Sequence, residues 1–188
     1  LELGVTTAII GNCGFTIAPC RKQDRDLNMK NLTKVEGMPY QTLKKGIDWS
    51  YKTYSDYLKL LEGKNLSLNI CSYIGHSALR IWCMGEDAMK RKATEEEILE
   101  MENVVKNAME SGAIGFSTST FEGHNGANGV PMPSRFATKD EIKRLVSAMA
   151  WQGRGIFMLT KSNGDNVKDI AELIGNSKRP AMIAPILY

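Results

Sequence analysis

The chain has 188 residues, of which 43% are hydrophobic and 24% are charged, and 24 Lys and Arg against 21 Asp and Glu leave a formal net charge of +3. This composition is typical of one globular domain, or of part of a larger one, and excludes a disordered chain. No apolar run approaches the roughly 18 residues of a membrane helix. The balanced charge gives no reason to expect a nucleic-acid partner. With only 2 histidines, the chain cannot form a site from several imidazoles.

The N-terminal residues 1–7 have no initiator Met and no basic stretch leading into an apolar core, so they are not typical of a signal peptide. Their pattern of a helix end, a glycine and the start of a strand predicts the interior of a longer protein. The cysteines show neither CxxC nor zinc-finger spacing: Cys13, Cys20, Cys71 and Cys83. Without a secretory signal, we expect reduced thiols and a cytoplasmic location.

Short apolar runs bounded by glycine or polar residues predict buried strands. In chain order they are Val5–Ile10, Leu66–Ile74, Ala113–Phe116, Gly155–Leu159 and Ala181–Leu187. Between the later runs, apolar residues recur at helical spacing and predict helices. At two of the predicted helix starts, a Thr is followed three residues later by a Glu, which predicts a capping box. The two pairs are Thr94 with Glu97 and Thr138 with Glu141. We expect Thr53 and Asp165 to cap two shorter helices.

Strands that alternate with helices predict βαβ units and a parallel sheet, either as a barrel or as an open doubly wound sheet. Ligands bind at the carboxyl ends of the strands in both architectures. Two connections are long: residues 15–52 are polar, Lys-rich and irregular, and residues 121–137 are rich in Gly and Pro. Loops of this length are usually functional lids or disordered segments.

The sharpest local feature is Gly11–Gly14, which places the Cys13 thiol in a tight turn at the first strand exit. A thiolate there either ligates a metal or acts as a nucleophile. The alternative interpretation is that Cys13 is a small residue packed under a turn, without a chemical role. At the second strand exit, His76 precedes Arg80, whose guanidinium is suited to binding a carboxylate. The alternatives are a histidine bonded to backbone and an arginine in a surface pair.

Hydroxyl side chains gather at the third strand exit, where Ser117 and Ser119 are candidates to bind an anionic or amide group of a substrate. His124 lies in the Gly-rich 121–137 loop, either as a lid contact or exposed to solvent. Lys161 follows the fourth strand and is a further candidate for substrate contact. No GxSxG, P-loop or GxGxxG pattern is present.

Several motifs occur in an ordered set. They are Gly4–Thr7 running into Gly11–Phe15, Gly75–His76 followed by Leu79–Arg80, Met84–Gly85, Thr94–Glu97 with Met101, and Gly112–Thr118. Up to about Trp151, their order and spacing resemble the D-aminoacylase (N-acyl-D-amino-acid deacylase) branch of the amidohydrolase superfamily. The resemblance implies an α/β fold, a (β/α)8 TIM-type barrel of alternating parallel strands and helices.

The resemblance also implies metal-assisted hydrolysis of the amide bond of a small N-acyl amino acid. In that family zinc is held by an HxH pair on the first strand, a Cys after the second and His residues after the fifth and sixth. Cys13 matches the cysteine ligand. The HxH strand and the last strand, with its general-base Asp, are absent, so residues 1–188 match the central segment of the barrel only.

Two positions depart from the family pattern, because Thr160–Lys161 and Ala184–Pro185 stand where the family has its later histidine ligands. We therefore expect no complete metal site in this chain and no activity of the isolated segment. Two other interpretations stay open. One is a metal-free hydrolase with Cys13 as nucleophile and His76 as base. The other is a degenerate, non-catalytic barrel segment that serves binding or assembly.

The first and last predicted strands, Val5–Ile10 and Ala181–Leu187, contain no charged residue. About five strands cannot close a barrel that needs eight. Uncharged strands at open sheet edges favour pairing with another chain. We therefore expect a homo-oligomer formed through these edges.

Overall fold

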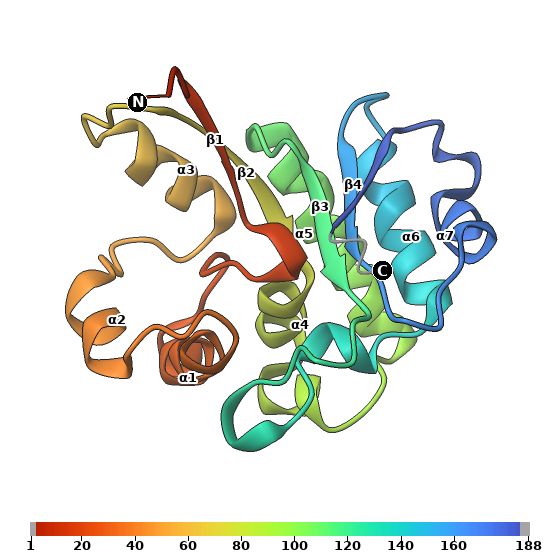
Figure 1. The fold of residues 1–188 in the computed structure, drawn as a ribbon, viewed down its shortest axis with the longest axis horizontal. Helices are drawn as coiled ribbons and strands as arrows, with labels where there is room; N and C mark the ends of the chain where they lie inside the picture. Colours follow the sequence, from red (N-terminus) through yellow and green to blue (C-terminus); the bar gives the residue numbers. More distant parts are fainter. Residues whose placement is uncertain (1–2, 185–188) are drawn as a thin grey trace.

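The computed structural model describes residues 3–184. Within them, five parallel strands pair in chain order into one curled sheet (Figure 1). The strands are β1 (Thr7–Ile10), β2 (Asn69–Gly75), β3 (Gly115–Ser119), β4 (Ile156–Thr160) and β5 (Ala181–Ile183). The sheet is part of a TIM-type barrel, as the sequence predicts, and not an open doubly wound sheet. The predicted end of the last strand, residues 185–187, lies outside the described residues.

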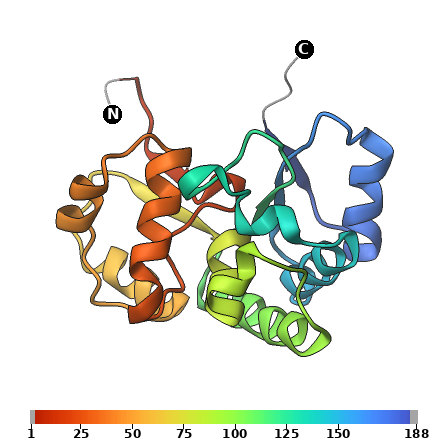
Figure 2. The same cartoon turned by 90° about the horizontal axis from the view of Figure 1, so that it is seen from below.

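Helices connect the strands, and most of them contribute residues to the core on one face of the sheet. They are α1 (Arg25–Val35), α2 (Tyr40–Gly46), α3 (Tyr54–Glu62), α4 (His76–Met84), α5 (Glu95–Ser111), α6 (Lys139–Ala150) and α7 (Val167–Ile174). Seen from below, α4 and α5 lie between α1 on one side and α6 and α7 on the other (Figure 2). The predicted capping box at Thr94 is complete, and the predicted cap Thr53 forms one as well. Each threonine accepts from the backbone N–H of the residue three positions on, and the carboxylate of that residue accepts from the threonine's backbone N–H.

Two predicted caps differ from the structure. Thr138 accepts from the Glu141 backbone N–H, but the Glu141 carboxylate does not return to Thr138. That side chain turns inward and is fully buried. The last helix is capped by Asn166, not by Asp165, because the Asn166 side chain accepts from Lys168 and Asp169. The Asp165 carboxylate instead accepts from the Thr120 hydroxyl at 2.6 Å.

The long segment 15–52 is more regular than its sequence indicates, because it contains α1 and α2. Helix α1 buries two asparagines and one methionine, so the apolar spacing that predicts a helix is missing from it. The segment 121–137 holds only single 3-10 turns. It lies against α1, where the Ala127 N–H donates to Asn31 Oδ1 at 3.3 Å.

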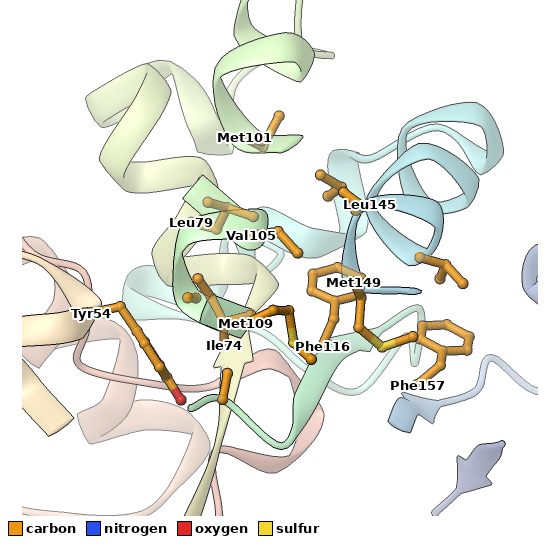
Figure 3. Packing of buried hydrophobic residues seen from close by; sticks show 14 of the residues in the cluster. Tyr54, Ile74, Leu79, Met101, Val105, Met109, Phe116, Leu145, Met149 and Phe157 are labelled. Atoms are coloured by element: carbon orange, nitrogen blue, oxygen red, sulfur yellow. The ribbon is translucent and has the colours of Figure 1, made fainter. Parts of the chain in front are cut away.

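The core fills the space between the sheet and helices α4 to α6 (Figure 3). From the strands, Ile74, Phe116 and Phe157 point into it and are fully buried. The helices contribute Leu79, Met101, Val105, Met109, Leu145 and Met149. Burying each such side chain stabilises the fold by about 1.5–3 kcal/mol. Because successive strand residues point to opposite faces, the neighbours of these core residues face the barrel interior.

Strands β1 and β5 form the two edges of the described sheet and do not pair with each other. Ile9 on β1 is 43% exposed and Met182 on β5 is 37% exposed. The described strands therefore do not close a barrel, in agreement with the expected strand count. Among residues 3–184, no helix has both the length and the apolar character needed to span a bilayer.

Candidate functional site

The turn at residues 11–16, here called the Cys13 turn, lies across the carboxyl ends of β2, β3 and β4. Its path requires left-handed backbone, with φ of +84° at Gly11, 59° at Cys13 and +77° at Gly14. The turn also packs closely, because a Cβ on Gly75 would lie 2.7 Å from the Gly14 carbonyl oxygen. The sequence prediction that Cys13 lies at a strand exit is confirmed.

Cys13 is held by two residues of β4 that face the barrel side. The Thr160 hydroxyl donates to Cys13 Sγ at 3.1 Å, and the Cys13 backbone N–H contacts Met158 Sδ at 3.3 Å. Burial raises the pKa of the Cys13 thiol, more than the Thr160 hydrogen bond lowers it. In this structure the thiol is therefore in its neutral form at pH 7.

Ser117 joins the Cys13 turn to β3. Its hydroxyl accepts from the Gly14 N–H at 3.2 Å and donates to the Gly11 carbonyl at 2.5 Å. Ser117 is fully buried, because the turn covers it. The Ser117 hydroxyl, a candidate for substrate binding in the sequence, thus makes its hydrogen bonds within the protein, and it binds the turn on either side of Cys13.

Ser119 and His124 meet at the same end of the sheet. The Ser119 hydroxyl lies 2.6 Å from His124 Nδ1. The rings of Phe15 and Phe121 approach the imidazole edge to face, with centroids 4.8 and 5.2 Å away. Burial lowers the pKa of His124, and the positive charge of Arg135 lowers it further. His124 is half-buried, and its contact with Ser119 connects the 121–137 segment to the carboxyl end of β3.

Lys161 turns toward its own loop. Its Nζ donates to the carbonyl oxygens of Ser162 at 3.0 Å and Asp165 at 3.1 Å. The ammonium group is partly exposed near the carboxyl end of β4. It lies beside the rim without a carboxylate partner in the described residues.

His76 and Arg80 lie on the opposite face of the sheet from Cys13, in the helix layer. Both are fully buried and both bind Glu141 of α6. Arg80 donates to the two carboxylate oxygens at 2.5 and 2.6 Å, and His76 Nε2 lies 2.8 Å from Oε1. On its other side, His76 Nδ1 lies 2.7 Å from the Thr118 hydroxyl. Neither the His76 imidazole nor the Arg80 guanidinium reaches the strand-exit rim.

These contacts define the protonation of the buried group. Burial lowers the pKa of His76, and the charge of Arg80 adds to this, while Glu141 opposes both. Burial alone would raise the pKa of Glu141, but the contacts to His76 and Arg80 outweigh it and lower the pKa. Neutral His76 therefore donates from Nε2 to ionised Glu141 and accepts from Thr118 at Nδ1.

Glu141 is the residue of this group that sequence reasoning missed. Because Glu141 lies three residues after Thr138, the sequence indicates that its carboxylate accepts a hydrogen bond in a capping box. That interpretation requires no other partner for the carboxylate. A second signal was present: Glu141 lies on the helix face that carries Leu145 and Met149, one and two turns on. A carboxylate on an apolar face predicts a buried ion pair.

A pH dependence of stability follows from the depressed pKa of His76. The unfolded chain takes up the proton near pH 6.5, whereas the folded chain resists it. The unfolded state then binds more protons, so the free energy of unfolding falls as the pH drops below about 6.5. We expect a His76→Gln variant to show a shallower decrease between pH 7 and 5 in urea unfolding.

The pKa of His124 is also lowered, so His124 contributes to the same pH dependence. A His124→Gln variant measures how much of the change in unfolding free energy with pH is due to His124. Equal slopes for the wild type and His76→Gln would contradict the protonation assigned to the buried group. The comparison uses the slope with pH, since either substitution can change the stability at pH 7 by itself.

The residues around Cys13 do not by themselves fit a metal ion. In residues 3–184, no group of three His, Cys, Asp or Glu side chains is placed to hold one. The side-chain partner of the thiol is the Thr160 hydroxyl, and the Met158 thioether contacts the Cys13 backbone N–H. Thr160 stands at one of the positions where the family resemblance implies a histidine ligand, and Pro185, at the other, lies outside the described residues.

Relatives of known activity match most of the chain. A D-aminoacylase from Alcaligenes xylosoxydans xylosoxydans is 32% identical over 157 residues, which are 84% of this chain and 28% of that protein. An N-acyl-D-glutamate deacylase from the same organism is 28% identical over 165 residues, 88% of this chain and 29% of that protein. The chain thus spans less than a third of the length of these relatives. No family model matches it.

Solved structures agree with the sequence matches. A D-aminoacylase described with a binuclear metal centre superposes with a TM-score of 0.70 at 29% identity, covering 96% of this chain and 34% of that one. An N-acyl-D-glutamate deacylase from Bordetella bronchiseptica, bound to zinc and a phosphonate inhibitor, shares the fold at 20% identity with a TM-score of 0.66. It covers 95% of this chain and 34% of its own.

A curled parallel sheet with polar side chains at its carboxyl end is the architecture of (β/α)8-barrel enzymes. Within that class, the sequence and structure matches assign the chain to one branch. The chain belongs to the D-aminoacylase branch of the amidohydrolases, which confirms the resemblance seen in the sequence motifs.

Proposed function

We propose that the protein carrying this chain is a zinc-dependent hydrolase of N-acyl-D-amino acids located in the cytoplasm, and that Cys13 is one of its metal ligands. The observation that carries the proposal is the Cys13 turn, which holds a thiol at the carboxyl end of the sheet through Ser117 and Thr160. Relatives that act on N-acyl-amino acids and hold metals support it. The remaining ligands would come from outside the described residues.

The chain's own residues divide into two groups under this proposal. Ser119, His124 and Lys161 lie at the rim, where they would contact the substrate. Ser117 holds the Cys13 turn, and the buried residues of the helix layer support the sheet. The free α-carboxylate of an N-acyl amino acid favours a cationic contact, and Lys161 offers the partly exposed ammonium group nearest the β4 exit.

A metal-free thiol hydrolase is disfavoured by the same geometry. A base for Cys13 must reach its Sγ, but both ring nitrogens of His76 are occupied by Thr118 and Glu141 on the helix side of the sheet. The raised pKa of Cys13 also opposes a thiolate nucleophile. A non-catalytic binding segment is the second candidate, because no three His, Cys, Asp or Glu side chains of the described residues are grouped to hold a metal.

The test measures zinc content and hydrolysis of N-acetyl-D-amino acids, with L-enantiomers in parallel, using the complete gene product. We expect zinc-dependent turnover of the D-enantiomers. A Cys13→Ser variant should lose more zinc affinity and turnover than the about 10–100-fold that removal of an outer hydrogen-bond partner costs. Cys71→Ser is the matched control, because Cys71 is half-buried on β2 and away from the turn.

Turnover that survives both chelation and Cys13→Ser would contradict the proposal. Metal-free turnover abolished by alkylation would favour the thiol hydrolase, and absence of any turnover would favour the binding segment. The purified 188-residue chain, assayed with added zinc, is expected to show no turnover above its Cys13→Ala variant.

A further inference from the structure

The buried group in the helix layer and the Cys13 turn meet at one strand. On β3, Thr118 contacts His76 on the helix side, while the adjacent Ser117 holds the turn on the barrel side. Adjacent strand residues point to opposite faces. One peptide unit therefore connects a hydrogen bond in the helix layer to the anchor of the thiol-bearing turn.

The Cys13 turn also contacts β3 and α4 directly through the backbone, with no side chain in between. A Cβ on Gly14 would lie 3.2 Å from the Ser117 carbonyl oxygen, 3.2 Å from Thr118 Cα and 3.4 Å from the His76 backbone nitrogen. The Cys13 turn thus rests directly on the exit of β3 and on the first residue of α4. Because the Ser117 hydroxyl also binds the Gly14 N–H and the Gly11 carbonyl, a shift of the β3 exit is expected to move the turn with it.

Packing alone does not account for this arrangement. His76, Arg80, Thr118 and Glu141 are each fully buried, and burial of polar groups costs free energy unless their hydrogen bonds are made. Apolar side chains would fill the same space without that cost. Apart from Arg80 Nε, which has no hydrogen-bond partner among the described residues, the buried side chains of this group are hydrogen-bonded. What such a connected polar network adds is a fixed relative position of the elements that carry it. Here these elements are α4, α6 and β3.

We propose that His76 and Thr118 are positioning residues for Cys13, and that their hydrogen bond, held in place by Glu141 and Arg80, sets the position of the β3 exit on which the Cys13 turn rests. The importance of the placement for catalysis rests on the proposed function. The placement itself does not, because it concerns contacts within residues 3–184. His76 thereby has a role different from that of a catalytic base.

The test is the alkylation rate of Cys13 by iodoacetamide in the folded chain, followed by peptide mass spectrometry so that each cysteine is read separately. Thr118→Val keeps the shape of the side chain and removes its O–H donor to His76. We expect it to raise the Cys13 rate by up to about tenfold, as the loss of one buried hydrogen bond allows. Thr118→Ser, which keeps the hydroxyl, should restore the wild-type rate.

Val146→Ala controls for a general loss of stability, because Val146 is fully buried in α6 and does not touch the turn. If Val146→Ala lowers the stability as much as Thr118→Val does, it should still leave the alkylation rate of Cys13 unchanged. In Thr118→Val, the alkylation rates of Cys20 and Cys83 should not rise with that of Cys13. An unchanged Cys13 rate in Thr118→Val, or an equal rise in Val146→Ala, would overturn the proposal. If the rate responds but Cys13→Ser keeps full zinc-dependent turnover, the positioning stands and the proposed role of Cys13 as a metal ligand fails.

Discussion

Replacing Glu141 with alanine is expected to lower the free energy of unfolding by about 3–5 kcal/mol, the cost of removing one partner from a buried ion pair. Arg80 donates to both oxygens of Glu141, and neither side chain is exposed. The substitution would leave the guanidinium charge buried without a carboxylate. It would also remove the acceptor of His76 Nε2. Urea unfolding at pH 7 measures the loss.

Two further variants make this result specific to the buried pair. Glu95→Ala removes a carboxylate that pairs with Arg144 at the surface, where the loss of an ion pair costs about 0–1 kcal/mol. A double variant, Glu141→Ala with Arg80→Met, also removes the stranded charge and should recover part of the stability. A loss in Glu141→Ala no larger than that in Glu95→Ala would show that the pair is not a buried support of the fold.

Gly115→Ala is the second substitution expected to be severe. A Cβ at Gly115 would lie 1.9 Å from the carbonyl oxygen of Ile156 and 2.7 Å from its nitrogen. Both atoms belong to the backbone of β4, which pairs with β3 at this position. No rotamer change can relieve the clash, so the two strands must separate locally. We expect a loss of about 3 kcal/mol, at the upper end of the usual cost of overpacking.

Gly46→Ala is its matched control, because a Cβ there meets no atom within 4 Å and the residue ends helix α2. Alanine at such a position is neutral or stabilising by about 0.4–1 kcal/mol. Thermal and urea unfolding of the two variants measure the difference. Equal stabilities would mean that β3 and β4 do not approach as closely as the structure describes.

The sequence was informative where the pattern of a segment decides its structure. Alternation of apolar runs with capped helices predicts the parallel sheet, since each strand needs an apolar run and each crossover needs a helix. The placement of Cys13 follows in the same way, because a residue after a parallel strand lies at its carboxyl edge. Helices α1 and α2 were missed, since they carry too few apolar residues at helical spacing.

The sequence could not reveal which candidate side chains face each other across the sheet. His76 and Cys13 both follow strands, yet they point to opposite faces, because His76 begins α4 and turns its ring into the helix layer. Arg80 follows it one helical turn later. Their partner Glu141 is 61 residues from Arg80 along the chain. No local pattern encodes a contact of that separation, so only the folded chain, in which the Glu141 side chain of α6 reaches α4, discloses it.

The order of the strands has a consequence for how the domain could be rearranged. Each strand pairs with the strands that precede and follow it in the chain, so no connection crosses over another strand. A cut between two βα units therefore leaves every helix beside its own strand and divides only one ladder of backbone hydrogen bonds. Such a chain can be lengthened or shortened by whole βα units through gene duplication or recombination, while the other strands keep their order and their neighbours.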